Sequence, residues 1–291
     1  MLTTHQKRPT SLGGVGLRYK HYQEALEQLP PKIGWFEVHP ENFFGGGPSL
    51  YHLTKIREHY PLSFHGVGLS LGSDQEPDGQ HLQILKDLIK RFEPFQFSDH
   101  VSWSASGNAH LNDLLPLPYT QETLDRLCRN IDITQDFLGQ EILVENPSTY
   151  IQFKEGVLTE PQLLNTLAKR TGCKLLLDVN NIFVQSHNHH FDPYAYIDAM
   201  NLDSVQEIHL AGHTERVIEK RNQEKETLLV DTHNRHVCQK VWDLYRYTVA
   251  KSGPVLTLIE WDQDFPTFQE LCEESYKAQD IMGQVDQKNV A

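Results

Sequence analysis

The feature that most constrains the fold of this sequence is a regular alternation of short apolar runs with longer amphipathic stretches. Eight runs have the length and composition of buried strands, at residues 14–17, 35–39, 62–66, 95–101, 141–146, 173–179, 205–212 and 255–261. Between them, apolar residues recur at the three- and four-residue spacing of helices, most clearly in 81–92 and 120–138. This order predicts a (β/α)8 TIM barrel that forms a single domain over residues 1–291.

A doubly wound open sheet is the alternative arrangement of the same elements. No G-x-G-x-x-G motif follows the first strand, and the chain shows neither a low-complexity linker nor an internal repeat. One composition shift interrupts the alternation, at the charged segment 214–231 after the seventh strand. We expect this insertion to be a solvated excursion or a small hairpin on the side where barrel loops carry function.

The composition excludes several classes of function. The formal net charge of −13 disfavours nucleic acid, because lysine and arginine supply most of the affinity for a phosphate backbone. The first ten residues lack the apolar core of a signal peptide, and no apolar run approaches the roughly 18 residues of a membrane span. The four cysteines form no C-x-x-C pair and are predicted to be reduced thiols. We therefore expect a cytoplasmic protein that binds neither nucleic acid nor membranes.

Acids and imidazoles gather at the ends of the predicted strands. A lone histidine on a strand is usually structural, and a lone aspartate after a strand is commonly a helix cap. In a barrel, however, the carboxyl ends of all strands converge on one face. Carboxylates buried together there need cations to neutralise them, and mixed histidine and carboxylate ligands suit iron, manganese or zinc. The residues concerned are Glu37, His39, Glu41, His65, Asp99, His100, Glu145, Asp178, Glu207, His209, His213, Glu260 and Asp262.

Two further segments extend this pattern. "DTHNRHV" places Asp231 and His233 after the charged insertion, and next to the seventh strand these two residues become a candidate ligand pair. The sixth strand runs into "LLLDVNNIFVQSHNHH", where the cluster His187, His189 and His190 follows Asp178. The sequence therefore predicts a metal-binding mouth, and it leaves open which histidines take part.

Seven segments together resemble one family: "HGVGLSLG", "SDHVSW", "LVENPSTY", "LLLDVNNIFV", "EIHLAGH", "DTHNRHV" and "LIEWD". The chain from about Gly14 to Ile281 resembles the UPF0276 family of MbnB-like and TglH-like multinuclear iron enzymes. The resemblance implies a xylose-isomerase-like barrel with two or three non-heme irons, for which other divalent metals can substitute on purification. It also implies O2-dependent modification of cysteine in a ribosomally made precursor peptide, which a partner protein presents.

The resemblance also implies roles for individual residues. The catalytic residues would be metal ligands, namely Glu145, Asp178, His209 and Glu260. Glu145 would bridge to a second iron held by His65 and His100, and a third metal would use Asp231 and His233, with His213 or Asn181 nearby. We expect the neighbouring acids Asp99, Glu207 and Asp262 to accept hydrogen bonds from imidazole N–H groups.

Two other classes of function use similar residues. Metal-dependent sugar isomerases and endonuclease-IV-like hydrolases place such ligands on the same barrel, and a non-enzymatic metal-binding scaffold is a further alternative. A nuclease needs a basic groove, which the negative charge disfavours, and an isomerase typically needs a lysine that no strand end supplies here. A scaffold would not need so many ligands with open coordination. The residues therefore favour the iron-dependent oxidase.

Overall fold

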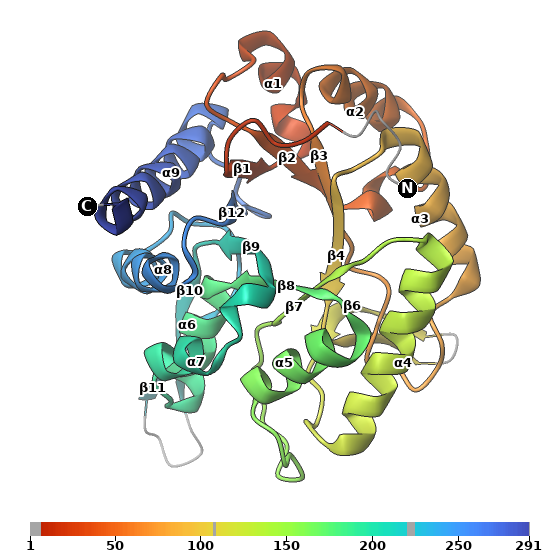
Figure 1. Cartoon of the computed structure of the whole chain (residues 1–291), viewed down its shortest axis with the longest axis vertical. Coiled ribbons are helices and arrows are strands. Elements are labelled where there is room, and N and C mark those ends of the chain that lie inside the picture. Colours follow the sequence, from red (N-terminus) through yellow and green to blue (C-terminus); the bar gives the residue numbers. More distant parts are fainter. Residues whose placement is uncertain (1–6, 107–108, 220–224, 291) are drawn as a thin grey trace.

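Eight parallel strands form a closed barrel in the computed structural model, which describes residues 7–106, 109–219 and 225–290. Around the barrel the strand order is β1-β12-β9-β8-β7-β4-β3-β2 (Figure 1). The predicted TIM barrel is thus confirmed, and each predicted strand is found within two residues of its expected ends. The strands are β1 (Gly13–Gly16), β2 (Trp35–Val38), β3 (Leu62–His65), β4 (Gln96–His100), β7 (Leu143–Glu145), β8 (Lys174–Asp178), β9 (Val205–Leu210) and β12 (Leu256–Ile259).

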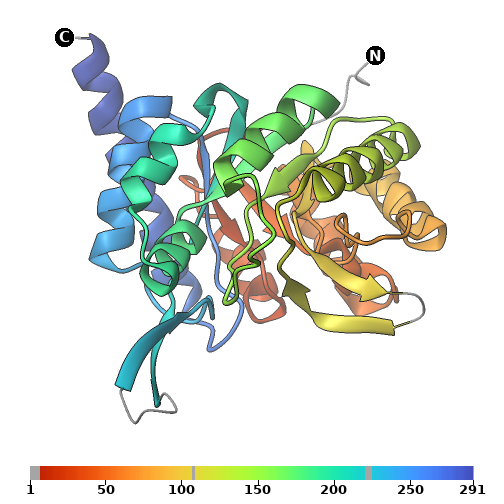
Figure 2. The ribbon, with the colours of Figure 1, turned by 90° about the horizontal axis from the view of Figure 1, so that it is seen from below.

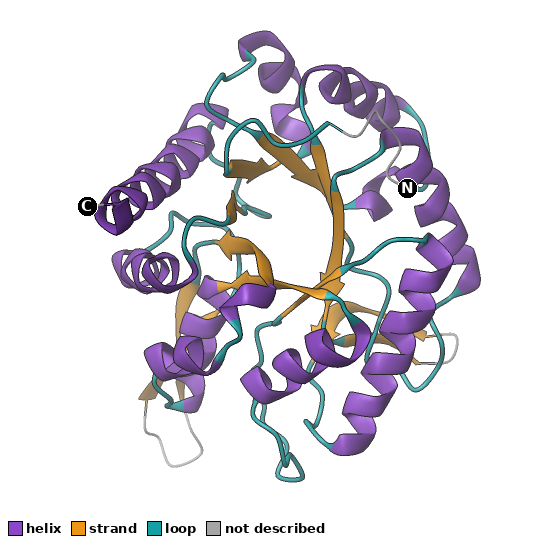
Figure 3. Cartoon of the chain, in the orientation of Figure 1, coloured by secondary structure: helices purple, strands orange, loops and turns teal. Residues whose placement is uncertain are grey.

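Helices surround the barrel as an outer ring (Figure 3). Three short 3-10 turns join them, η1 (Tyr19–His21), η2 (Pro40–Phe43) and η3 (Leu202–Ser204). The α-helices are α1 (Tyr22–Gln28), α2 (Pro48–His59), α3 (Gly79–Phe92), α4 (Gln121–Leu138), α5 (Glu160–Thr171), α6 (Val179–His189), α7 (Pro193–Ala199), α8 (Gln239–Ser252) and α9 (Phe268–Val290).

Local sequence signals determine where the helices begin and end. The Thr120 hydroxyl accepts a hydrogen bond from the backbone N–H of Thr123 at the start of α4. At α5, Thr159 and Gln162 form a reciprocal capping box. Both helices end at a glycine, Gly139 or Gly172, whose φ of +75° lies in the left-handed region that favours a residue without Cβ.

The strands separate an apolar layer from a polar barrel interior. Phe36, Phe64 and Phe97 point outward from neighbouring strands into the core between barrel and helices, where they are fully buried. Alternate residues on the same strands point inward, so that the Ser63 hydroxyl donates to Glu37 Oε2 at 2.8 Å. The interior is therefore lined with hydrogen-bonding groups below the mouth.

Two hairpins project from the same end of the barrel (Figure 2). Hairpin β10 (Thr214–Glu219) and β11 (Lys225–Val230) occupies the charged insertion, which was expected as an excursion or a hairpin; residues 220–224 lie outside the described part. Hairpin β5 (Trp103–Ser106) and β6 (Ala109–Leu115) was not predicted, because its sequence lacks the apolar runs of the barrel strands. Both hairpins follow the carboxyl ends of barrel strands, and they flank the mouth.

The cysteines and helices agree with the other expectations from composition. All four cysteines are unpaired, and only Cys238 is not fully buried. Within the described ranges, no helix combines the length and apolarity that crossing a bilayer requires.

We predict that Leu167→Ala, in the buried face of α5, lowers the free energy of unfolding by about 2–5 kcal/mol. The substitution removes a fully buried side chain and leaves a cavity between helix and barrel. Lys169→Ala, on the exposed face of the same helix, should change the free energy by less than about 0.5 kcal/mol. Urea unfolding followed by circular dichroism measures both values, and equal midpoints for the two variants would contradict this packing.

Candidate metal centre

The register of the barrel brings the strand-end residues together. His100 at the end of β4 pairs with Glu145 at the end of β7, and Asp178 at the end of β8 pairs with His209 in β9. Glu260 follows β12 directly, beside β9. All of these side chains are buried, although they come from positions spread along most of the chain.

One group of candidate ligands consists of His65, His100 and Glu145. The Nε2 atoms of His65 and His100 each lie 3.2 Å from Glu145 Oε2, and the two rings are 4.6 Å apart between centroids. Despite these short distances, Glu145 Oε2 has no partner with hydrogen-bond geometry among the described residues. Three potential metal-ligand atoms thus lie close together without hydrogen bonds between them.

A second group shares Glu145 with Asp178, His209 and Glu260. His209 Nδ1 lies 3.1 Å from Glu260 Oε2, and donor atoms of Glu145, Asp178 and His209 all fall within 4.8 Å of one another. Asp178 Oδ1 caps α6 by accepting from the Asn181 N–H at 2.6 Å, whereas its Oδ2 has no partner among the described residues. One oxygen of Asp178 therefore caps α6, and the other is available to a ligand.

A third pair, Asp231 and His233, lies at the rim of the mouth. His233 Nε2 is 2.7 Å from Asp231 Oδ1, yet the contact lacks hydrogen-bond geometry. Asn180 donates to Asp231 Oδ1 at 2.7 Å, and its own Oδ1 lies 2.8 Å from His213 Nδ1.

Asn181, which was expected near the third pair, hydrogen-bonds to the shared candidate ligand Glu145 and projects from α6 in a different direction from Asn180. Its amide nitrogen donates to Glu145 Oε1 at 3.4 Å and to the Asn146 carbonyl, and its Oδ1 accepts from the Ser148 hydroxyl. The residue beside the Asp231 and His233 pair is therefore Asn180, which links that pair to His213.

Hydrogen bonds orient the imidazole rings. The Ser98 hydroxyl lies 2.8 Å from His65 Nδ1, and Asp262 Oδ2 lies 3.1 Å from His233 Nδ1. His209 Nε2 lies 3.2 Å from Glu37 Oε1 and 3.3 Å from Glu207 Oε1. Each of these rings thus has one nitrogen held by a neighbour and the other directed toward a candidate ligand.

Among the described side chains, no imidazole donates a hydrogen bond to Asp99, in contrast to Glu207 and Asp262. It alternates with Ser98 and His100 on β4 and so points away from the barrel interior. Its oxygens accept from the backbone N–H groups of His100 and Leu69, and the nearest imidazole nitrogen is 3.9 Å away. The inward neighbour Ser98, which we did not predict, binds His65 instead.

Arg18 is the other residue that the strand-end pattern missed. Its guanidinium is buried, and Nη2 donates to Asp262 Oδ1 at 2.5 Å and to Glu260 Oε1 at 3.4 Å. Burial by itself lowers the pKa of Arg18, but Asp262 and Glu260 raise it above its ordinary value. The available signal was an arginine directly after the first apolar strand, "GVGLR".

The three histidines after Asp178 serve another purpose. They lie at the carboxyl end of α6 (Val179–His189), whereas the candidate ligands lie at the strand end that precedes this helix. His187 Nε2 lies 2.9 Å from the Thr227 carbonyl, and His189 Nε2 lies 2.8 Å from the Thr149 carbonyl. These contacts attach α6 to hairpin β10–β11 and to the segment after β7.

Burial shifts the titration of the candidate ligands in opposite directions. It raises the pKa of Glu145 well above its ordinary range and that of Asp178 to about 7. It lowers the pKa of His65 well below its ordinary value and that of His100 to about 4. Near neutral pH these two imidazoles are therefore uncharged, and each keeps a lone pair for a metal.

The donor set fits divalent cations. Glu145 Oε2, Asp178 Oδ2 and His233 Nε2 are buried polar atoms without hydrogen-bond partners among the described residues. Ligand atoms about 2.0–2.2 Å from a shared ion come within roughly 3 Å of one another. The Nε2 atoms of His65 and His100 lie 3.2 Å from Glu145 Oε2, and His209 Nδ1 lies 3.1 Å from Glu260 Oε2. Several overlapping groups of histidine, aspartate and glutamate residues, most of them buried, have donor atoms within 4.8 Å of one another.

Comparison with solved structures shows the fold of the chain. Endonuclease IV from Thermus thermophilus aligns with a TM-score of 0.54 and 15% identity, covering 94% of this chain and 98% of that one. D-psicose 3-epimerase from Clostridium cellulolyticum aligns with a TM-score of 0.55 and 11% identity, covering 94% and 97%. A xylose isomerase-like TIM barrel protein from Mycobacterium smegmatis gives a TM-score of 0.51 and 11% identity, covering 98% and 99%.

Comparison of sequences shows the family. A "UPF0276 protein" of Psychromonas ingrahamii is 45% identical over 270 residues, covering 92% of this chain and 93% of the relative. Another from Caulobacter vibrioides is 46% identical over 270 residues, covering 92% and 94%. Residues 12–283 match the family model described as RiPP precursor modification enzyme MbnB/TglH/ChrH, where RiPP denotes a ribosomally synthesised and post-translationally modified peptide. The chain therefore belongs to the MbnB/TglH/ChrH family of RiPP precursor modification enzymes.

Proposed function

We propose that the chain is a multinuclear non-heme iron enzyme that uses O2 to modify cysteine residues of a precursor peptide presented by a partner protein. One observation carries the proposal, namely two groups of buried ligands that share Glu145 at the mouth of the barrel. Membership of a peptide-modifying family supplies the substrate class. The fold alone does not, because epimerases and endonuclease IV share it.

The ligand groups suggest how the irons would be held. His65, His100 and Glu145 would hold one ion, and Glu145 with Asp178, His209 and Glu260 would hold a second. Asp231 and His233 would hold a third ion at the rim, with Asn180 positioning Asp231. When bound, the irons supply the redox chemistry toward O2 and leave coordination positions for a substrate thiolate.

The surrounding residues would hold the imidazoles of His65, His209 and His233 in the tautomer that ligation needs. Ser98 accepts the proton of His65 Nδ1, which turns Nε2 toward Glu145. Glu37 and Glu207 accept the proton of His209 Nε2, which leaves Nδ1 free to share a cation with Glu260. Arg18 holds Asp262, and Asp262 in turn holds His233 by Nδ1.

The first prediction of this proposal concerns activity. Protein loaded with Fe2+ in the presence of its partner should change the mass of a cysteine-containing precursor peptide in air. Mass spectrometry of the peptide measures the change, and the same mixture without O2 should give none. The same product from zinc-loaded protein, or cleavage of abasic DNA, would favour the hydrolase alternative over the oxidase.

The second prediction concerns the shared ligand. Glu145→Gln removes a charge next to both groups and should lower the content of two ions, whereas His233→Ala should remove mainly the rim ion. Glu141→Gln, on an exposed acid shortly before β7, is the matched control and should retain every ion. Elemental analysis of the purified variants measures the loss. Full metal content in Glu145→Gln would exclude the bridging role.

The third prediction concerns pH. The raised pKa values of Glu145 and Asp178 mean that both groups hold protons near neutral pH in the metal-free chain. A metal must displace these protons, so its apparent affinity should rise with pH between about 6 and 8, by up to roughly tenfold per unit for each proton released. Calorimetry in buffers of different ionisation enthalpy counts the protons. Affinity that falls with rising pH would refute this protonation state.

A further inference from the structure

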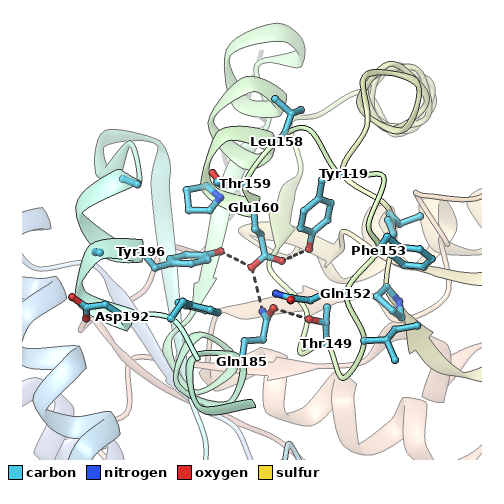
Figure 4. Close-up of a pocket in the computed structure, with 18 residues that line it drawn as sticks. Tyr119, Thr149, Gln152, Phe153, Leu158, Thr159, Glu160, Gln185, Asp192 and Tyr196 are labelled. Carbon is cyan, nitrogen blue, oxygen red and sulfur yellow. Dashed lines mark hydrogen bonds between the residues drawn. The ribbon is translucent and has the colours of Figure 1, made fainter. Parts of the chain in front are cut away.

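A cavity of about 530 Å3 opens at the start of α5. It lies between α5, α7 and two segments, residues 116–119 and 149–159 (Figure 4). None of the ligands discussed above lines it. The cavity is therefore a separate recess that the proposed chemistry leaves without a role.

The walls of the cavity are largely apolar, and their apolar surface continues onto the exterior. Leu117, Leu158 and Phe191 contribute to the walls. At the rim, Ile151 and Phe153 are 58% and 40% exposed, and nearby Val157 is 74% exposed. Three large apolar side chains within seven residues, next to a recess, are typical of a surface that covers a ligand.

The floor of the cavity is a buried carboxylate. Glu160 is 8% exposed and accepts hydrogen bonds from Tyr119 Oη at 2.5 Å, Tyr196 Oη at 2.8 Å and Gln185 Nε2 at 3.2 Å (Figure 4). A carboxylate has about four acceptor positions, so one remains beyond these three donors. Burial raises the pKa of Glu160, an effect that the three donors oppose.

The charges of the cavity favour a cation. Asp192 is a second acid in the lining, and no lysine, arginine or histidine is among the described residues that line the cavity. The chain as a whole carries a formal charge of −13, which attracts basic ligands at long range. A basic side chain has an apolar stem for the walls and a charged end for the floor.

One segment joins this cavity to the metal centre. The Ser148 hydroxyl donates to Asn181, which contacts Glu145, and Tyr150 Oη accepts from the Asp231 N–H at 2.9 Å. On the other side of the segment, the Thr149 hydroxyl donates to Gln185 Oε1 at 2.8 Å, beside Glu160. Residues 148–150 therefore contact both the surroundings of the metal centre and the surroundings of the cavity.

We propose that this cavity binds an arginine or lysine side chain of the precursor peptide and so positions the peptide's cysteine at the metal centre. The identity of the ligand as precursor peptide rests on the proposed function. The preference for a basic side chain rests on Glu160, Asp192 and the apolar walls alone.

The test compares two probes, N-acetyl-leucyl-arginine amide and the same compound with citrulline, a neutral analogue of arginine. NMR titration with the full chain should show roughly tenfold tighter binding of the arginine probe, because a hydrogen bond to a charged partner is stronger than one to a neutral partner. Glu160→Gln keeps the shape of the floor and should reduce this preference to less than about threefold. Glu122→Gln, on an exposed acid of α4, should leave it unchanged.

A second variant guards against misfolding of Glu160→Gln. Ala195→Trp fills the cavity from an exposed position on α7 and should abolish binding of both probes. Equal affinity for arginine and citrulline, or a preference that survives Glu160→Gln, would overturn the proposal. The titration needs neither iron, O2 nor the partner protein. Failure of the oxidase proposal therefore leaves its result intact, and failure of the cavity proposal leaves the oxidase intact.

Discussion

The structure depends on the burial of several carboxylates and imidazoles in one barrel mouth. Glu145 is almost completely buried next to Asp178 and Glu260, and each ionised carboxylate there raises the free energy of the others. Hydrogen bonds relieve only part of this cost, since oxygens of Glu145 and Asp178 have no partners among the described residues. Bound cations would supply the missing interactions. Metal binding and the stability of the mouth would therefore depend on the same residues.

The polar interior of the barrel supports this arrangement from below. Glu37, Ser63 and Glu207 point inward beneath the ligands, and both glutamates hold His209. Burial and the neighbouring Glu37 carboxylate raise the pKa of Glu207 to about 8. Arg18 adds one buried positive charge beside Asp262 and Glu260. The candidate ligands therefore lie at the mouth of the barrel, and a second set of hydrogen-bonded polar residues lies beneath them.

The two proposals assign different parts of the peptide to the mouth and to the cavity. Under them, the metal centre would bind a thiol, and the cavity would bind a basic side chain between its apolar walls and its acids. Residues 148–153 separate the two and contact both through Asn181, Asp231 and Gln185. Hairpins β5–β6 and β10–β11 project at the same end of the barrel (Figure 2).

Much of the fold followed from the sequence by itself. The eight barrel strands and the bounds of α4 were predictable because burial demands apolar runs of the right period, and because Thr120 and Gly139 signal the ends of a helix. The convergence of His65, His100, Glu145, Asp178, His209 and Glu260 also followed, since barrel topology brings strand ends together. Only the tertiary structure decided that Asp99 points outward, that Asn180 rather than Asn181 contacts Asp231, and that Arg18, Ser98 and Glu160 matter. Strand alternation separates Asp99 from its neighbours in the sequence, but which set faces inward, and which partners the other residues meet, depends on contacts between distant segments.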